Sequence, residues 1–159
     1  MSMSCYLCGY IQGSVIEQCL AWRKKIRETY DNWPTGKYPI NWIDPLNGER
    51  FNEISPDGLK CCFPPNAIVH KDYASVKKSD LIICNTDTFG QNRPLVGTIF
   101  ELAWAYEFRK PVIMITNDIV FEQHPFITNT ISWYVKSVDE LLEKKIINEF
   151  YKAWHSAQY

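Results

Sequence analysis

Two carboxylates stand at positions where helical spacing predicts apolar side chains. Asp72 lies four residues after Ile68 and four before Val76, so it shares their face of a helix. Glu101 lies three residues before Trp104, on a similarly apolar stripe. Because a buried acid costs several kcal/mol unless it is paired, each of these carboxylates needs a partner or a chemical task.

A structural reading exists for each acid. Thr98 and Glu101 form a T-x-x-E capping box, in which Glu101 would only hydrogen-bond back to the Thr98 amide. Asp72 could lie on a solvated helix edge. Asp80, between a helix and a strand, is typical of a turn-forming acid. Pattern alone leaves the structural and catalytic readings of Asp72 and Glu101 open.

The catalytic reading gains support from the residues around these acids. Gly97 leaves the entrance of the Glu101 helix open to a ligand, and Gly9 does the same at the end of the first expected strand. Tyr6 places a phenol near that strand end. Two acids and a tyrosine around one glycine-lined rim form a plausible set of nucleophile, acid and base.

Apolar runs and helical periodicity predict the elements that position these residues. Strands are expected at 4–9, 39–44, 81–84, 112–116 and 131–135, and helices at 15–30, 67–78, 98–108 and 138–154. Helix caps are expected at Ser14, Asn66, Thr98 and Ser137. Residues 45–66 and 85–96 are expected to be loops, the longer one a lid or binding loop. Alternating strands and helices predict an α/β protein, one domain over 1–159, with a parallel sheet covered on both faces.

Composition excludes several classes of function. The chain has 159 residues and a formal net charge of -1, with scattered Lys and Arg, so we expect no nucleic-acid or membrane partner. No apolar run approaches the roughly 18 residues that span a bilayer, and the N-terminus lacks a signal peptide, so a cytoplasmic location is expected. The six cysteines are expected to be reduced thiols used for packing, with no metal ion and no cofactor.

The order and spacing of these motifs resemble the nucleoside 2-deoxyribosyltransferase superfamily, which also contains 2'-deoxynucleoside 5'-monophosphate N-glycosidases. The resemblance rests on Tyr6-Leu7-Cys8-Gly9 with Ile11 and Gly13, on the Asp72 to Asp80 spacing before 81–84, and on 97–102 followed by Ala103. It covers most of the chain, from Cys5 through Leu141. It implies a flavodoxin-like three-layer fold with a five-stranded parallel sheet, assembled as a homo-oligomer, either a dimer or higher.

The resemblance also implies roles for single residues. Glu101 would attack C1' of the deoxyribose and form a covalent glycosyl-enzyme, Asp72 would protonate the departing base, and Tyr6 would hold and tune the nucleophile. An oxocarbenium-like transition state needs such a carboxylate and such a proton donor. The substrate-binding candidates are Gly9, Tyr10, Asn92, Gly97, Thr98, Asn129 and Tyr159. The partners would be a nucleoside and a free nucleobase.

Departures from the family pattern narrow the substrate. The monophosphate-cleaving members hold the 5'-phosphate with an arginine and small hydroxyl residues, where this chain has Tyr10 and Gln12, and with a serine where it has Leu95. Loss of those contacts argues against a 5'-phosphate, although Arg93 could compensate. The aspartate that transferases often place just before the Gly97 position is absent, and Asn92 is the nearest candidate.

Three functions follow as hypotheses. The first is a nucleoside 2-deoxyribosyltransferase that passes deoxyribose to another base, and the second is a nucleoside or 5'-monophosphate N-glycosidase. The third is a non-catalytic nucleotide-binding module, in which some of the six Trp and nine Tyr would stack on bases instead of filling the core or an oligomer interface. The choice of base, the choice of sugar and the oligomer number are left open.

Overall fold

The computed structural model describes residues 2–11, 16–32, 38–46, 51–55, 58–61 and 63–158, with the backbone alone for 51–55 and 58–61. The cap expected at Ser14 and the site candidate Tyr159 lie outside these residues, as do Gln12 and Gly13.

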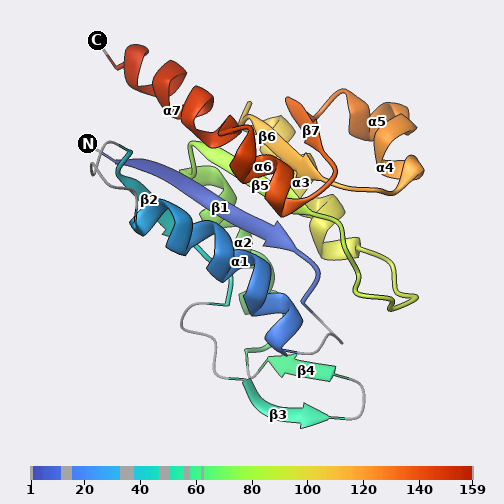
Figure 1. Ribbon diagram of the computed structural model, residues 1–159. Helices are drawn as coiled ribbons and strands as arrows, with labels where there is room; N and C mark the ends of the chain where they lie inside the picture. The colour runs from blue at the N-terminus through green and yellow to red at the C-terminus, as the bar shows by residue number, and fades with distance from the viewer. Residues whose placement is uncertain are drawn as a thin grey trace.

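A five-stranded parallel sheet forms the centre of the molecule (Figure 1). Its strands are β1 (Met3–Gly9), β2 (Ile40–Ile43), β5 (Leu81–Asn85), β6 (Val112–Ile115) and β7 (Trp133–Val135). They lie in the order β2-β1-β5-β6-β7, and every neighbouring pair is parallel. Counted among the sheet strands alone, this is the 2-1-3-4-5 order of a flavodoxin-like fold. The expected fold class is confirmed.

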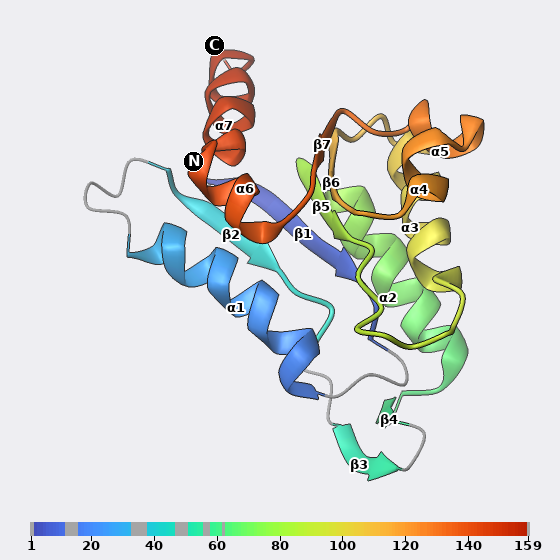
Figure 2. The ribbon, with the colours of Figure 1, turned by 45° about the vertical axis from the view of Figure 1, so that its right-hand side comes forward.

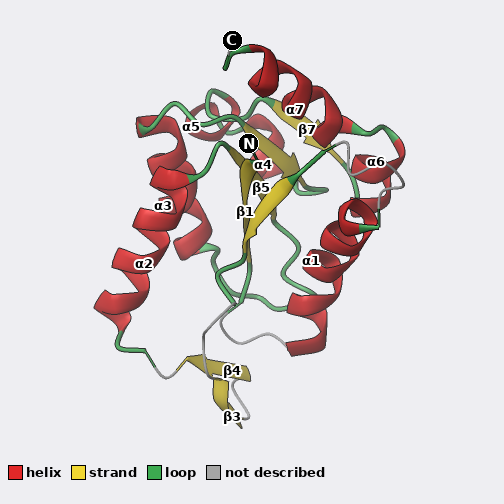
Figure 3. Ribbon diagram, turned by 90° about the vertical axis from the view of Figure 1, so that its left-hand side faces the viewer, coloured by secondary structure: helices red, strands yellow, loops and turns green. Residues whose placement is uncertain are grey.

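Helices cover both faces of the sheet (Figure 3). Helices α1 (Ile16–Asp31), α6 (Val138–Glu143) and α7 (Ile146–Ser156) contribute to the core on one face. Helices α2 (Pro65–Lys78) and α3 (Val96–Glu107), with the short α4 (Ile119–Gln123), contribute to the core on the other. No helix in the described part of the chain is both long and apolar enough to cross a membrane.

Strand β1 serves both cores because its side chains alternate between the two faces of the sheet. Cys5 and Leu7 lie in the core under α1, whereas Tyr6 and Cys8 lie in the core under α2 and α3. All four side chains are completely buried. The strand pairs with β2 on one side and β5 on the other, so it is the second strand from one edge of the sheet.

The expectation of an unstructured loop over 45–66 is wrong. The segment contains an antiparallel hairpin of β3 (Phe51–Ser55) and β4 (Gly58–Cys61), which forms a separate two-stranded sheet (Figure 2). The sequence carries a signal for it, because Pro56-Asp57-Gly58 between two short runs is typical of a tight turn.

Two expected helix starts are also wrong. Helix α2 begins at Pro65, and its cap residue, Pro64, makes no side-chain bond. Proline suits the first helical position because its missing N–H would have no partner there. Helix α3 begins at Val96, two residues before Thr98, and it too has no side-chain cap. Thr98 is therefore inside the helix, and the expected capping box does not form.

The C-terminal third of the chain differs from the sequence-based expectation in two further ways. The single helix expected over 138–154 is divided into α6 and α7, because Lys145 adopts a left-handed conformation with φ of 53°. The cap at Ser137 is confirmed, since its hydroxyl accepts a bond from the Glu140 amide. Helices α4 and α5 (Pro125–Thr128) were not expected. Asp118 caps α4 by accepting from the Val120 amide at 2.8 Å, an Asx pattern that the sequence carries.

Candidate active site

Glu101 points from α3 onto strand β1 and is only 7% exposed. Its Oε1 accepts a hydrogen bond from the Tyr6 hydroxyl at 2.5 Å, and its Oε2 accepts one from the Cys8 thiol at 2.7 Å. Both donors come from the same face of β1, two residues apart. The carboxylate is thus engaged by the sheet, and the reading of Glu101 as a helix cap is wrong.

Burial dominates the electrostatics of Glu101. It raises the pKa of this carboxyl from 4.5 to about 7, while the hydrogen bonds from Cys8 and Tyr6 oppose the shift. The Asp72 carboxyl raises the same pKa further, and Arg23 lowers it. A carboxylate with this pKa is partly ionised at neutral pH and keeps much of the reactivity that a contacting cation would remove.

Tyr6 links the two acids singled out in the sequence. Burial raises the pKa of its phenol well above 10, and the nearby carboxyls of Glu101 and Asp72 raise it further. The phenol therefore keeps its proton and acts as a hydrogen-bond donor. Its hydroxyl also lowers the pKa of Asp72, so the structure brings Tyr6, Asp72 and Glu101 together.

The surroundings of Asp72 favour the protonated form of its carboxyl. It lies half-buried on α2, where burial raises the pKa of its carboxyl against the opposing effects of Lys71 and Tyr6. Its Oδ1 is buried without a hydrogen-bond partner among the described residues. A neutral carboxyl with an unengaged oxygen can deliver a proton to a bound molecule.

Lys71 is a cation near these acids that no sequence pattern indicated. Its Nζ donates to the carbonyl oxygen of Pro45 at 2.6 Å, which ties α2 to the segment after β2. Burial lowers the pKa of this amine, and the carboxyls of Asp72, Asp44 and Glu101 oppose that shift. Lys71 therefore supplies positive charge to the whole acidic group.

A buried ion pair fixes the ends of β1 and β2. Arg23 on α1 is completely buried, and its guanidinium donates to the carbonyl oxygens of Cys19 at 2.7 Å and Gly9 at 3.3 Å. Its Nε lies 3.7 Å from Asp44, which follows β2. The sequence carried a signal for this pair, because Arg23 falls on the apolar stripe of α1, four residues after Cys19.

The two glycines of the expected rim differ in their surroundings. A Cβ at position 9 would lie 2.8 Å from the carbonyl oxygen of Asn85 and 3.1 Å from the Trp22 ring, so packing already requires a glycine there. At Gly97 a Cβ would meet nothing within 4 Å, so the start of α3 is open to close approach. Contact of either glycine with a ligand stays a prediction.

The other binding candidates are dispersed. Thr98 is buried one turn before Glu101, and Tyr10 is buried with its hydroxyl unpaired among the described residues. Asn92 lies exposed in the loop before α3. Asn129 is exposed, and its amide donates to the carbonyl oxygen of Pro125 at 2.7 Å, within its own turn. Their contacts with a substrate stay predictions.

A cavity of about 690 Å³ opens at the carboxyl ends of β5, β6 and β7. Ligands bind at such edges in open α/β sheets. Its lining mixes apolar and aromatic side chains with hydroxyls, amides, carboxylates and two cations, Arg93 and Lys136. The hydroxyls of Thr86 and Thr116 bond to each other at 2.6 Å. Of its described lining residues, none belongs to the Tyr6, Asp72 and Glu101 group. These two acids lie instead between β1 and the α2–α3 layer.

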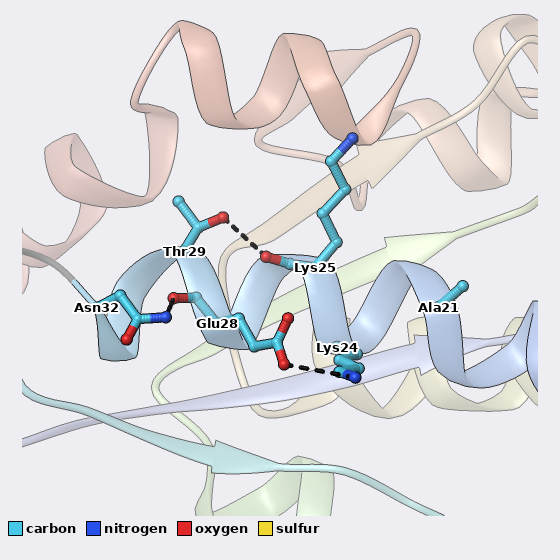
Figure 4. A pocket seen from close by; sticks show the side chains of 6 residues that line it. All are labelled: Ala21, Lys24, Lys25, Glu28, Thr29 and Asn32. Atoms are coloured by element: carbon cyan, nitrogen blue, oxygen red, sulfur yellow. Dashed lines mark hydrogen bonds and ion pairs between the residues drawn. The ribbon is translucent and has the colours of Figure 1, made fainter.

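A second hollow of about 630 Å³ lies along the exposed side of α1 (Figure 4). Lys24 pairs with Glu28 at 3.6 Å and Thr29 donates to the Lys25 carbonyl oxygen at 2.8 Å, both within the helix, whereas the Lys25 ammonium pairs with Asp139 of α6. We interpret this hollow as solvated helix surface. Among all the described residues, no group of three or more His, Cys, Asp or Glu side chains is arranged as metal ligands would be.

Comparison with known proteins gives structural likeness without sequence similarity. No protein-family model and no curated protein matches the chain. The solved structure of the CMP N-glycosidase BcmB from Clostridium botulinum is similar with a TM-score of 0.51 and 13% identity, over 91% of this chain and 98% of that one. A 2-desoxiribosyltransferase from Leishmania mexicana is similar with a TM-score of 0.46 and 16% identity, over 73% of this chain. The chain spans 65% of the length of that transferase. These likenesses concern the fold.

Proposed function

We propose that this protein cleaves the N-glycosidic bond of 2'-deoxynucleosides through a covalent glycosyl-enzyme on Glu101 and passes the deoxyribose to another base. One observation carries the proposal. Glu101 is a buried carboxyl whose two oxygens are held by neutral donors, the hydroxyl of Tyr6 and the thiol of Cys8. Such an arrangement orients a carboxylate and leaves it reactive.

The reaction divides between the two acids. Ionised Glu101 forms a bond to C1' while the bond from C1' to the base nitrogen breaks, and the base leaves with the proton of Asp72. In the second half, a nitrogen of another base attacks C1', its proton returns to Asp72, and Glu101 is released as a carboxylate. The same groups therefore serve both directions of transfer.

The reaction requires an ionised Glu101 and a protonated Asp72, and the pKa shifts of the site bear on both. Burial raises the pKa of Glu101 to about 7, so this carboxyl is partly ionised at neutral pH, and burial also raises the pKa of Asp72, which favours its protonated form. Tyr6 keeps its own proton because burial raises its pKa well above 10. It thus donates to Glu101 without taking part in the proton transfer.

An unphosphorylated nucleoside is the favoured substrate. Leu95, which stands where monophosphate-cleaving relatives place a serine, is 7% exposed and packs in the α2–α3 core. An apolar side chain there offers no donor to a phosphate. Hydrolysis of a 5'-monophosphate is the second candidate, and it is favoured by the likeness to a CMP N-glycosidase over 91% of this chain.

Chromatography of a 2'-deoxynucleoside incubated with the protein, with and without a second free base, tests the proposal. We expect a new deoxynucleoside only when the second base is present, and no product from Glu101→Gln. The matched control is Glu107→Gln at the exposed end of the same helix, which should react like the natural protein.

Other outcomes select the alternatives. Free deoxyribose without an exchange product would replace transfer by hydrolysis, and faster release from a 5'-monophosphate would restore the phosphate as a recognised group. Thermal stabilisation by nucleosides with no base released over hours would favour a non-catalytic binding module.

A further inference from the structure

We propose that Cys8 is a positioning residue, whose thiol selects Oε2 of Glu101 as the attacking oxygen by holding it with a bond weak enough to be given up. This inference rests on the proposed function and deepens it. From the sequence, Cys8 was expected to be a packing thiol, and its contact with Glu101 is a finding of the structure.

The geometry fixes both oxygens of Glu101. Tyr6 and Cys8 are two residues apart on β1 and therefore point to the same face of the sheet. The Tyr6 hydroxyl donates to Oε1 at 2.5 Å, and the Cys8 thiol donates to Oε2 at 2.7 Å. Two donors on one rigid strand set the plane of the carboxylate as well as its position.

The two donors differ in strength. A phenol bound to a carboxylate forms a strong, charge-assisted bond, whereas a thiol is a weak donor. Bond formation to C1' removes negative charge from the attacking oxygen, so the donor on that oxygen is lost or weakened in the transition state. The oxygen with the weaker donor loses less hydrogen-bond stabilisation when it attacks C1', and that oxygen is Oε2.

The thiol keeps its proton over the working range. Cys8 is completely buried, and burial raises the pKa of its thiol well above 9. Cys84 on β5 lies behind it, with the two sulfurs 3.9 Å apart. The charged or titratable groups that act on Glu101 are Tyr6 and Cys8 from β1, Asp72 and Lys71 from α2, and Arg23 from α1. Of these, Cys8 and Tyr6 bond to its oxygens directly.

Two substitutions at Cys8 separate a hydrogen-bonding role from a packing role. Cys8→Ala leaves Oε2 without a donor, so the pKa of Glu101 should rise and the acid limb of the pH–rate profile should move to higher pH. Cys8→Ser supplies a stronger donor, so the limb should move to lower pH. Its plateau kcat should fall about tenfold, because the ionised oxygen must give up a charge-assisted bond. The two shifts have opposite signs.

A matched control is available on the same strand. Cys5 is equally buried but faces the other core, away from Glu101. Cys5→Ser therefore buries a hydroxyl at a similar cost to stability. It should lower the melting temperature without moving the acid limb.

A measurement that needs no turnover makes the test independent of the proposed function. Carbon-13 NMR of side-chain-labelled glutamate reports the titration of Glu101, which Glu101→Gln assigns by removing one signal. We expect the titration midpoint of Glu101 to rise in Cys8→Ala and fall in Cys8→Ser. Midpoints that stay together or move in one direction would overturn the role of Cys8. Absence of base release by the natural protein, with the midpoints moving as expected, would instead overturn the proposed function and leave the bond from Cys8 to Glu101 standing.

Discussion

Two buried carboxylates, Asp44 after β2 and Glu101 on α3, are placed in opposite chemical surroundings. Asp44 is 5% exposed and lies 3.7 Å from Arg23 and 3.4 Å from Arg27, and it also accepts from the Leu46 amide at 3.0 Å. Glu101 is 7% exposed and contacts only neutral donors among the described residues. Burial alone therefore does not distinguish the structural acid Asp44 from the proposed nucleophile Glu101, but the charge of the contacting donors does.

The largest effect is expected when the structural acid is neutralised. Asp44→Asn leaves the completely buried Arg23 without its counter-charge, which should lower the free energy of unfolding by about 3–5 kcal/mol. Denaturant titration at pH 7 measures this loss. The control is Glu28→Gln, which removes the solvent-exposed partner of Lys24 and should change stability by less than about 0.5 kcal/mol. A loss below about 1 kcal/mol for Asp44→Asn would remove the distinction between the two acids.

Neutralising the proposed nucleophile, Glu101, should change the free energy of unfolding in the opposite direction. The native state holds a proton on Glu101 between the ordinary pKa of 4.5 and the raised pKa of about 7, so stability falls as pH rises through this window. At about 1.4 kcal/mol for each pH unit, the difference amounts to about 3 kcal/mol. Glu101→Gln, which does not titrate, should therefore be more stable than the natural protein at pH 8 by up to about 3 kcal/mol.

The pH dependence is the test of that gain. Thermal unfolding of both proteins from pH 4.5 to pH 8 should show a stability difference that grows with pH and vanishes at the acidic end. A constant difference would mean that the amide packs better, and that the charge on Glu101 is not the cause.

Removing one neutral donor should weaken catalysis more than stability. Tyr6→Phe deletes the hydroxyl that donates to Oε1, and a hydrogen bond to a charged group is worth about 1.5–3 kcal/mol. We expect kcat to fall about 10- to 100-fold, with the acid limb of the pH–rate profile moved to higher pH. Tyr134→Phe, which removes a hydroxyl bonded to the Phe121 carbonyl, is the control. An unchanged limb in Tyr6→Phe would show that this phenol does not tune Glu101.

The smallest effect is expected at the outer cation of the structural pair. Arg27 is 26% exposed, so Arg27→Lys keeps a charge near Asp44 while losing the guanidinium geometry. We expect a loss of less than about 1 kcal/mol in the free energy of unfolding, measured by denaturant titration. A loss as large as that of Asp44→Asn would mean that Arg27, and not Arg23, carries the pair.

Sequence patterns predicted the sheet better than they predicted the helix ends. All five parallel strands were expected from short apolar runs, and the signal is clearest for β5, which is buried along its whole length. Helix α3 was started too late because Thr98 and Glu101 match a capping box, and no local signal distinguishes a glutamate that bonds its own helix from one that bonds a strand. The partners of Glu101 lie 95 and 93 residues away in the chain.

In the candidate site, too, some residues carried a sequence signal and others did not. Asp72 and Glu101 were identified as acids on apolar stripes, Tyr6 as a phenol near a strand end, and all three by resemblance, and the structure brings them together. Cys8 was missed because a buried cysteine is usually a packing residue. The sequence could nevertheless have predicted that Cys8 faces the same side of the strand as Tyr6, since residues i and i+2 of a strand share a face.

The alternation of side chains along β1 has a consequence for how the gene can vary. Insertion or deletion of one codon between positions 3 and 6 would turn every later side chain of the strand to the opposite face. Leu7 would then take the place of a donor to Glu101, and the hydroxyl and thiol would be driven into the apolar core under α1. Length changes in this stretch of coding sequence therefore conserve the site only when they come in pairs of codons. Single-codon scanning of β1 should show this parity directly.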